Sequence, residues 1–221
     1  MEISEQDNNI LVCDKGNMCL HSYMKDNTKT YKLSFSMNAI DSSKINLTNF
    51  LSHNIYELLD KINPELIEKI YILKVYNDDA ADILILLKHI AKEVGIKQKY
   101  IIFYTKRIID YENNSIIFTN KDINLIDENL VKHYLDSIEL DKNKYEPMLY
   151  KFGTIKISLT NTSILELSDE NNRNKIVNTD FETHFQLIMK DKLPIYMENL
   201  IGLMIKKIFY NLKVFIDNLN I

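Results

Sequence analysis

Residues 70–90, IYILKVYNDDAADILILLKHI, place two adjacent aspartates between two apolar runs. The first run, residues 68–76, is apolar on both faces apart from Lys74, which is typical of an inner strand of a parallel sheet. The second run carries a helical stripe and ends at Gly95, which predicts a helix; the stripe consists of Ile83, Leu87, Ile90, Ala91 and Val94. KYIIFYT, residues 99–105, predicts a further strand. This order predicts a parallel, right-handed crossover.

The aspartates Asp78 and Asp79 stand where the strand would pass into the helix. Paired carboxylates at the end of a buried strand can hold a metal ion, but Asp is also a common helix cap. We expect the second role, with Asp82 reaching back, because negative charge at a helix N-terminus is stabilising by roughly 0.3–1 kcal/mol.

The segment before this stretch predicts three strands and a helix. The strands NILVC (9–13), MCLHSYM (18–24) and KTYKLSFSM (29–37) are separated by polar turns, which indicates an antiparallel meander. Gly16 lies in the first turn and can adopt a positive φ. Residues 45–62, INLTNFLSHNIYELLDKI, change to a helical period.

The segment after it is less regular. Residues 107–120 predict a hairpin, and DENLVKHYLDSI, residues 127–138, a short helix. The charged loop ELDKNKYEP, residues 139–147, is a candidate boundary between lobes. Residues 148–167 then predict strands, and TDFETHFQLIMKDK, residues 179–192, predicts a helix.

These elements predict an α/β protein with two lobes. An N-terminal lobe would span residues 1–125, a connecting helix and loop residues 126–147, and a partial second lobe residues 148–221. The last lobe ends in a long amphipathic helix, whose apolar face is a partner-docking candidate: Met197, Ile201, Met204, Ile208 and Phe215. The alternative is that this face packs on the protein's own core.

The composition is that of a globular protein, with 46% hydrophobic and 26% charged residues. The formal charge of -4 and the pI of about 5.8 argue against a nucleic-acid-binding protein, since such domains usually have a pI above about 9. Cys13 and Cys19 are too few for a disulfide scaffold, and the first residues lack the features of a signal peptide. We therefore expect a cytoplasmic protein with reduced thiols and no membrane span.

Several short strings resemble those of Hsp70 chaperones, in the superfamily of actin and sugar kinases. ILVCDKGN, with Asp14 and Gly16, resembles the first phosphate loop, and YKFGTIKISL, with Gly153 and Thr154, resembles the second. Residues 66–105 resemble the strand, turn, helix and strand between them. The resemblance implies RNase H-like (actin-like ATPase) lobes, with mixed β-sheets and flanking helices.

The departures from the Hsp70 pattern concern the residues that handle nucleotide. Lys151 stands in place of the aspartate of the second loop, and Tyr104 replaces the carboxylate that would position water and metal. A phosphate loop also needs glycines, and the chain has four. The resemblance therefore implies a degenerate domain that has lost ATP hydrolysis and holds no cofactor. Its implied role is that of a non-catalytic binding subunit, which supports a J-protein co-chaperone or a ribosome-associated chaperone complex.

Two alternatives remain open from the sequence. One is a protein that still binds ATP and magnesium through Asp14, although Asp is equally common in a hairpin turn. The other is a metal-dependent RNase H-like nuclease, with carboxylates from Asp14, Glu57 and Asp78 on two metal ions. No two histidines stand at a metal-binding spacing and no serine lies in a nucleophile elbow, so no further catalytic centre is expected.

Overall fold

The computed structural model describes residues 10–26, 28–44, 51–89, 97–168, 175–188 and 195–219, the last of these with side chains from residue 200. The elements are β1 (Ile10–Lys15), β2 (Met18–Lys25), β3 (Thr28–Asp41), α2 (Ile55–Ile62), β4 (Ile67–Asn77), β5 (Ala80–Leu87), β6 (Gln98–Asp110), β7 (Ser115–Asp122), η2 (Ile123–Leu125), α3 (Glu128–Ser137), β8 (Tyr145–Pro147), β9 (Leu149–Leu159), α4 (Ile164–Ser168), β10 (Ile176–Ile188) and α5 (Ile195–Leu219).

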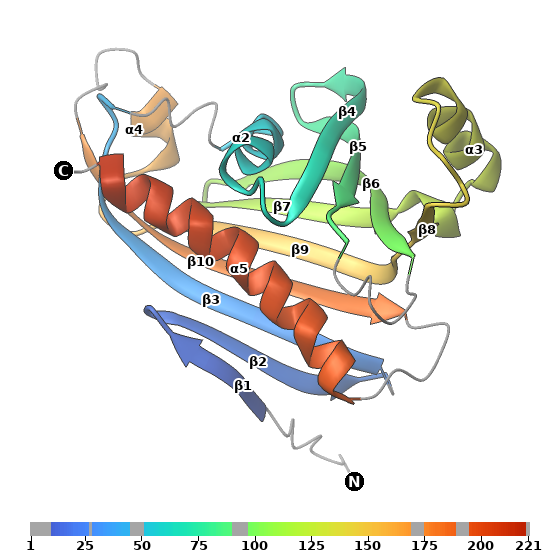
Figure 1. Ribbon diagram of the computed structural model, residues 1–221. Coiled ribbons are helices and arrows are strands. Elements are labelled where there is room, and N and C mark those ends of the chain that lie inside the picture. The colour runs from blue at the N-terminus through green and yellow to red at the C-terminus, as the bar shows by residue number, and fades with distance from the viewer. Residues whose placement is uncertain are drawn as a thin grey trace, which may run out of the picture.

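One curved sheet of ten strands dominates the molecule, and α5 lies diagonally across its concave face (Figure 1). The strand order is β1-β2-β3-β10-β9-β7-β6-β5-β4, with β8 paired to β6. Among the described strands every pairing is antiparallel except the short one between β6 and β8. The expected RNase H-like lobes are therefore wrong. The sheet is continuous across the ranges that the sequence assigns to two lobes.

Within the stretch 70–90, β4 and β5 form an antiparallel β-hairpin, so the predicted helix and parallel crossover are wrong. Asp78 and Asp79 form the turn between β4 and β5, where the Asn77 side chain accepts a hydrogen bond from Asp79 N at 2.9 Å. Asx turns of this kind are a common way to reverse the chain. Asp78 and Asp79 thus cap no helix. The part of the predicted helix at residues 90–95 lies outside the described residues.

Strand β5 is buried on both faces, which explains why its sequence resembles a helix. Ile83, Ile85 and Leu87 point into the concave face, while Leu84 and Leu86 join a second core on the convex face. A continuous apolar run in a doubly buried strand cannot be distinguished from a buried helix by periodicity alone.

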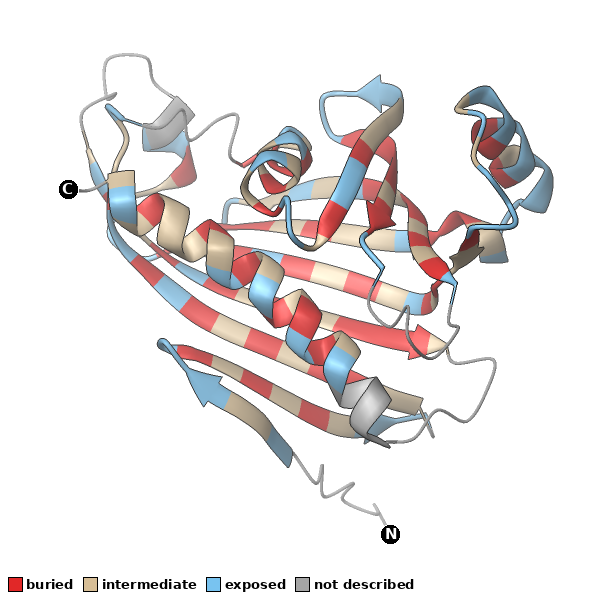
Figure 2. Cartoon of the chain, in the orientation of Figure 1, coloured by how far each residue is buried: buried red, intermediate tan, exposed pale blue. Residues whose placement is uncertain are grey.

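The segment expected to be a helix at residues 179–192 belongs largely to β10, through Ile188. Strand β10 lies between β3 and β9, and its burial alternates along the strand (Figure 2).

Several other elements predicted for the described residues are confirmed. The antiparallel meander is confirmed by β1 to β3, the 107–120 hairpin by β6 and β7, the short helix by α3 and the terminal helix by α5. The predicted helix at 45–62 is confirmed over Ile55–Ile62.

The main core lies between the concave face and the helices α2 and α5. From α5 it contains Phe209, Leu212 and Ile216, the last two fully buried. Gly202 brings the helix close to the sheet, because a Cβ at this position would lie 2.9 Å from Cε1 of Tyr31 on β3. The helix therefore packs on the protein's own core, which is the alternative to docking that the sequence left open.

A second core lies on the convex face, under α3. At its edge the buried carboxylate of Asp82 accepts hydrogen bonds from Tyr76 Oη at 2.8 Å and from Tyr134 Oη at 2.6 Å. Asp82 is therefore no helix-capping residue. It links β5 to α3, since Tyr134 belongs to that helix.

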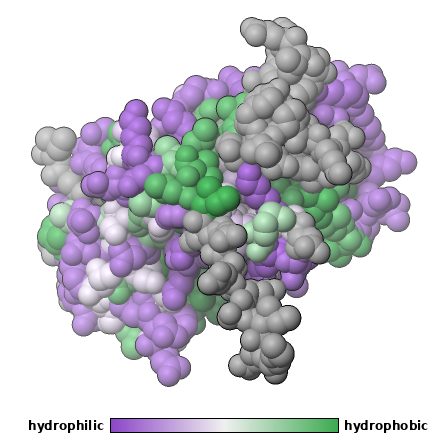
Figure 3. Space-filling view, turned by 90° about the horizontal axis from the view of Figure 1, so that it is seen from below, coloured by the Kyte–Doolittle hydropathy of each residue, from purple (hydrophilic) through white to green (hydrophobic). Residues whose placement is uncertain are grey.

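On the face seen from below, the described residues are largely hydrophilic, with hydrophobic groups in limited areas (Figure 3). Of the helices in the described part of the chain, none is both long and apolar enough to cross a membrane.

Candidate functional site

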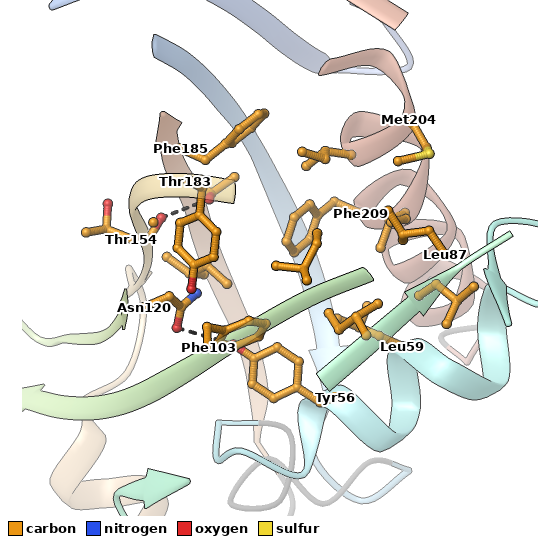
Figure 4. A pocket seen from close by; sticks show the side chains of 18 of the residues that line it. Tyr56, Leu59, Leu87, Phe103, Asn120, Thr154, Thr183, Phe185, Met204 and Phe209 are labelled. Carbon is orange, nitrogen blue, oxygen red and sulfur yellow. Dashed lines mark hydrogen bonds between the residues drawn. The ribbon is translucent and has the colours of Figure 1, made fainter. Parts of the chain in front are cut away.

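A cavity of about 140 Å³ lies between the concave face of the sheet, α2 and α5 (Figure 4). Helix α5 contributes Met204, Ile205, Ile208 and Phe209 to its lining, and the strands contribute mainly Ile, Leu and Phe. The cavity forms because the strongly curved sheet and the straight helix cannot remain in contact along their whole length. Its wall is therefore almost entirely hydrocarbon.

The floor of the cavity contains three packed aromatic rings from three elements. Phe103 of β6 lies with its ring centroid 5.4 Å from that of Tyr56 on α2 and 6.2 Å from that of Tyr150 on β9. The second pair is edge to face, an arrangement that stabilises aromatic contacts. Packed rings of this kind hold the two phenol groups in fixed positions.

Polar atoms gather at one end of the cavity. Tyr56 Oη lies 3.5 Å from Oδ1 of Asn120 on β7, which is long for a hydrogen bond. Tyr150 Oη is buried and has no hydrogen-bond partner within the described structure. Thr183 Oγ1, by contrast, is satisfied, because it donates to the backbone oxygen of Thr154 at 2.8 Å.

A β-bulge in β9 directs Tyr150 into the cavity. Gly153 and Tyr150 both line it although they are three residues apart, whereas strict alternation would place them on opposite faces. The register with β10 shifts between Gln186 and Leu187, so that Gly153 pairs with Phe185 and Tyr150 with Leu187. The extra residue in β9 restores the inward direction of Tyr150.

The electrostatics of the polar end favour neutral groups. Burial raises the pKa of Tyr56 to about 12, and burial together with the nearby carboxyl of Asp122 raises the pKa of Tyr150 well above its usual value. Both phenols therefore keep their protons at neutral pH and can donate them in hydrogen bonds. None of the described residues that line the cavity carries a charge.

Asp122 lies behind this end and has a structural role. One of its oxygens accepts a hydrogen bond from the backbone N–H of Tyr150 at 3.0 Å, and the other caps the η2 turn at Asn124 N. Burial raises the pKa of its carboxyl above the ordinary value.

A buried lysine stands on α5, next to the residues that line the cavity. Lys206 is 6% exposed, and its Nζ lies 3.1 Å from Sγ of Cys13 on β1. In the described residues no carboxylate pairs with it in an ion pair. The contact joins the helix to the edge strand of the sheet.

The structure separates the candidate residues of the two phosphate loops. Asp14 and Gly16 belong to β1 and the turn after it, whereas Gly153 and Thr154 belong to β9, and three strands lie between β1 and β9. Gly16 has φ +65°, as a tight hairpin turn requires. Gly153 and Thr154 line the apolar cavity instead.

The carboxylates of the nuclease alternative are also dispersed. Asp14 lies on β1, Glu57 on α2 and Asp78 in the β4–β5 turn at the opposite edge of the sheet. Within the described residues no three acidic, histidine or cysteine side chains are placed to hold a metal ion. The nuclease alternative is therefore wrong.

The apolar residues proposed for partner docking face inward where the structure describes them. Met204 and Ile208 line the cavity, and Ile201 and Phe215 pack against the main core. The side chain of Met197 lies outside the described part of the structure.

Solved structures with the same architecture are StAR-related lipid transfer domains. Human StAR-related lipid transfer protein 5 matches with a TM-score of 0.66 and 8% identity, over 97% of this chain and 89% of that chain. The lipid transfer and protein localization domain of human StarD13 (DLC2) matches with a TM-score of 0.57 and 9% identity, over 93% and 89%. A StAR-related lipid transfer protein from Xanthomonas axonopodis matches with a TM-score of 0.54 and 11% identity, over 97% of this chain and 100% of that chain. The chain has their helix-grip fold.

At these identities the likeness establishes the fold and not the ligand. No family model matches the chain, and no curated protein does. The helix-grip fold overturns the resemblance to Hsp70 and actin, together with the chaperone role, the J-protein partner and the residual ATP site that it implied. The physical reason is the antiparallel sheet, which provides none of the parallel crossovers on which those lobes are built.

Sequence reasoning missed the residues that define the cavity, namely Tyr56, Asn120 and Tyr150. They are 30 or more positions apart and belong to three different elements. One signal was present: Gly153 interrupts an apolar strand, and a glycine inside a strand often marks a bulge or a space beside the backbone.

Proposed function

We propose that this protein binds a small apolar molecule, of lipid character, in the cavity between the sheet and α5. The observation that carries the proposal is the hydrocarbon lining of the cavity, with polar groups at one end only. Pockets for small molecules are typically mostly apolar, with a few placed polar groups. The names of the structural neighbours, which refer to lipid transfer, agree with this class of ligand.

The volume sets the size of the ligand. A cavity of about 140 Å³ is close to the roughly 150 Å³ of an engineered apolar cavity that binds benzene, and below the roughly 300–1,000 Å³ of drug-sized pockets. The cavity therefore accepts a single ring or the end of a chain.

The affinity for such a probe can be estimated from its area. A ring that buries on the order of 150 Å² gains about 4 kcal/mol, which corresponds to a dissociation constant on the order of 1 mM. Benzene at about ten times that constant would add about 1.4 kcal/mol to the free energy of unfolding. For a chain of this length we expect the melting temperature to rise by about 3–6 °C.

A filled cavity provides the test. Leu59→Phe adds a larger side chain on the α2 wall, so this variant should fold but lose the rise in melting temperature with benzene. Leu165→Phe on α4, at a residue 66% exposed, is the matched control and should keep the rise. If benzene stabilises Leu59→Phe as much as the unmodified protein, or stabilises neither, the cavity is not the binding site.

A further inference from the structure

The hydroxyl of Tyr150 is a buried donor for which the protein provides no acceptor. The residue is 6% exposed, and its Oη has no hydrogen-bond partner within the described structure. Buried hydroxyl groups nearly always form hydrogen bonds, because a buried donor or acceptor without a partner destabilises the fold. A hydroxyl that stays unpaired at the wall of a cavity points to an acceptor on the ligand.

Tyr56 and Asn120 make this end of the cavity a polar site with several contacts. Tyr56 Oη lies 3.5 Å from Asn120 Oδ1 and also contacts the side chain of Thr105, so this phenol is held at the same end of the cavity. In Figure 4 the labelled side chains of Tyr56 and Asn120 point toward each other from α2 and β7. The three polar groups come from different elements, and packing of the aromatic rings fixes two of them.

Gly153 leaves space for an atom of the ligand beside these groups. A Cβ built on Gly153 would lie 3.5 Å from Asn120 Cβ and 3.8 Å from Tyr150 Cε2, which is ordinary van der Waals contact. Because Gly153 has no side chain, there is room for about one methyl-sized group next to the polar atoms.

The charge of the site excludes an anionic ligand group. The nearby carboxyl of Asp122 is one cause of the raised pKa of Tyr150, and the same field acts against a carboxylate or phosphate at this place. None of the described lining residues supplies a positive charge to offset it. An ionised group in such an environment would be strongly destabilised.

We infer that the ligand carries one neutral oxygen, a carbonyl or hydroxyl, that accepts a hydrogen bond from Tyr150 Oη, while the rest of the ligand is hydrocarbon. This inference rests on the proposed function, because it assigns the orientation and chemical class of the ligand in the same cavity.

Four six-membered rings of similar size test the inference: cyclohexane, cyclohexanol, cyclohexanone and cyclohexanecarboxylate. Their dissociation constants are measured by NMR titration on the unmodified protein and on Tyr150→Phe. We expect Tyr150→Phe to weaken cyclohexanone and cyclohexanol by about fivefold to tenfold, the effect of one hydrogen bond, and to leave cyclohexane unchanged. Cyclohexanecarboxylate should bind to neither protein.

Two controls separate this effect from a general disturbance. Tyr100→Phe also removes a buried phenol, but Tyr100 lies in the second core and its hydroxyl is 3.4 Å from Asn124, so it should leave all four constants unchanged. Gly153→Ala fills the space beside Tyr150 and should weaken the two oxygenated rings more than cyclohexane.

The outcomes distinguish the two levels of the argument. If cyclohexane binds and Tyr150→Phe weakens all rings equally or none, the inference is overturned and the proposed function stands. Binding of cyclohexanecarboxylate as tight as that of cyclohexanone also overturns it. If no ring binds to the unmodified protein, the proposed function fails and the inference fails with it.

Discussion

At the scale of single residues, Gly202 on α5 and Gly153 on β9 differ in what surrounds them. A Cβ at Gly202 would meet the Tyr31 ring at 2.9 Å, and this ring cannot move, because it is fully buried and stacks on Phe185 with centroids 5.1 Å apart. Overpacking costs about 1–3 kcal/mol, and better helix propensity offsets up to about 1 kcal/mol. We expect Gly202→Ala to lower the melting temperature by about 3–6 °C, measured by circular dichroism.

Gly153→Ala is the matched control for that prediction. The same methyl group meets only ordinary contacts at Gly153, so the melting temperature should stay within about 2 °C of that of the unmodified protein. A Gly202→Ala protein as stable as Gly153→Ala would show that α5 does not approach the sheet as closely as the structure indicates.

The same scale explains why the sequence did not reveal the candidate site. Period-2 alternation in β9 predicts Gly153 and Tyr150 on opposite faces, and only the register with β10 shows the bulge that brings them together. The surroundings of Tyr150 also include Asp122, which accepts a hydrogen bond from its backbone N–H and is distant in the chain. The glycine was visible in the sequence, but the resemblance to a phosphate loop gave it a different meaning.

At the scale of elements, strand and helix were confused at β5, which is buried on both faces, and at β10, in the middle of the sheet. The amphipathic elements were predicted correctly: α3, α5 and the meander of β1 to β3 each have one polar side. The errors at β5 and β10 occur in strands inside the sheet, covered on one or both faces. In β5 the polar residues that would show the period are scarce, and Asp82 is itself buried. In β10 burial alternates along most of the strand, so the period-2 pattern was present there and was overlooked.

The pairing of β3 with β10 contains an ion-pair network that makes stability depend on pH. Burial would raise the pKa of Glu182, but hydrogen bonds from Lys32 and His184 lower it below the ordinary value. Lys32 Nζ lies 2.6 Å and His184 Nε2 2.8 Å from the Glu182 carboxylate. A depressed folded-state pKa stabilises the protein above the unfolded value, near 4.3, and this stabilisation disappears as pH falls through the folded value.

We therefore expect Glu182→Gln to lower the free energy of unfolding at pH 7 and to have a smaller effect as the pH falls below the unfolded-state pKa. Because Glu182 is 39% exposed, the difference at pH 7 should be at most about 1 kcal/mol. Urea unfolding of both proteins at several pH values between 7 and 3 measures this difference in the free energy of unfolding. A difference that is constant over this range would mean that the substitution acts through packing and not through the charge.

At the scale of the whole molecule, the sheet depends on contacts that the sequence order conceals. Strand β3 pairs with β10, more than 130 residues later, and this pairing inserts the last strand into the middle of the sheet. Local strings such as ILVCDKGN predict a strand and a turn correctly, but the same strand–turn–strand unit occurs in many folds. The element order resembled that of actin-like lobes only because two strands were taken for helices.

Helix α5 closes this sheet and contributes a large part of the total stability. In the part of α5 with described side chains, four apolar side chains are buried, Met204, Phe209, Leu212 and Ile216; each is worth about 1.5–3 kcal/mol, or about 6–12 kcal/mol together. That sum is comparable to the entire stability of a typical domain, about 5–15 kcal/mol. The helix is therefore required for folding. A ligand bound beneath it would add apolar contacts to the same core.

Two leucines of α5 test this dependence. Leu212 is fully buried, so Leu212→Ala should lower the free energy of unfolding by about 2–5 kcal/mol, measured in urea. Leu203 on the same helix is 39% exposed, and Leu203→Ala should change it by less than about 0.5 kcal/mol. Equal effects would mean that α5 does not pack on the sheet through the Leu212 face. If Leu212→Ala lowers the free energy of unfolding only slightly, α5 contributes little to the core. Such a helix could leave the sheet at little cost and would be free to bind a partner.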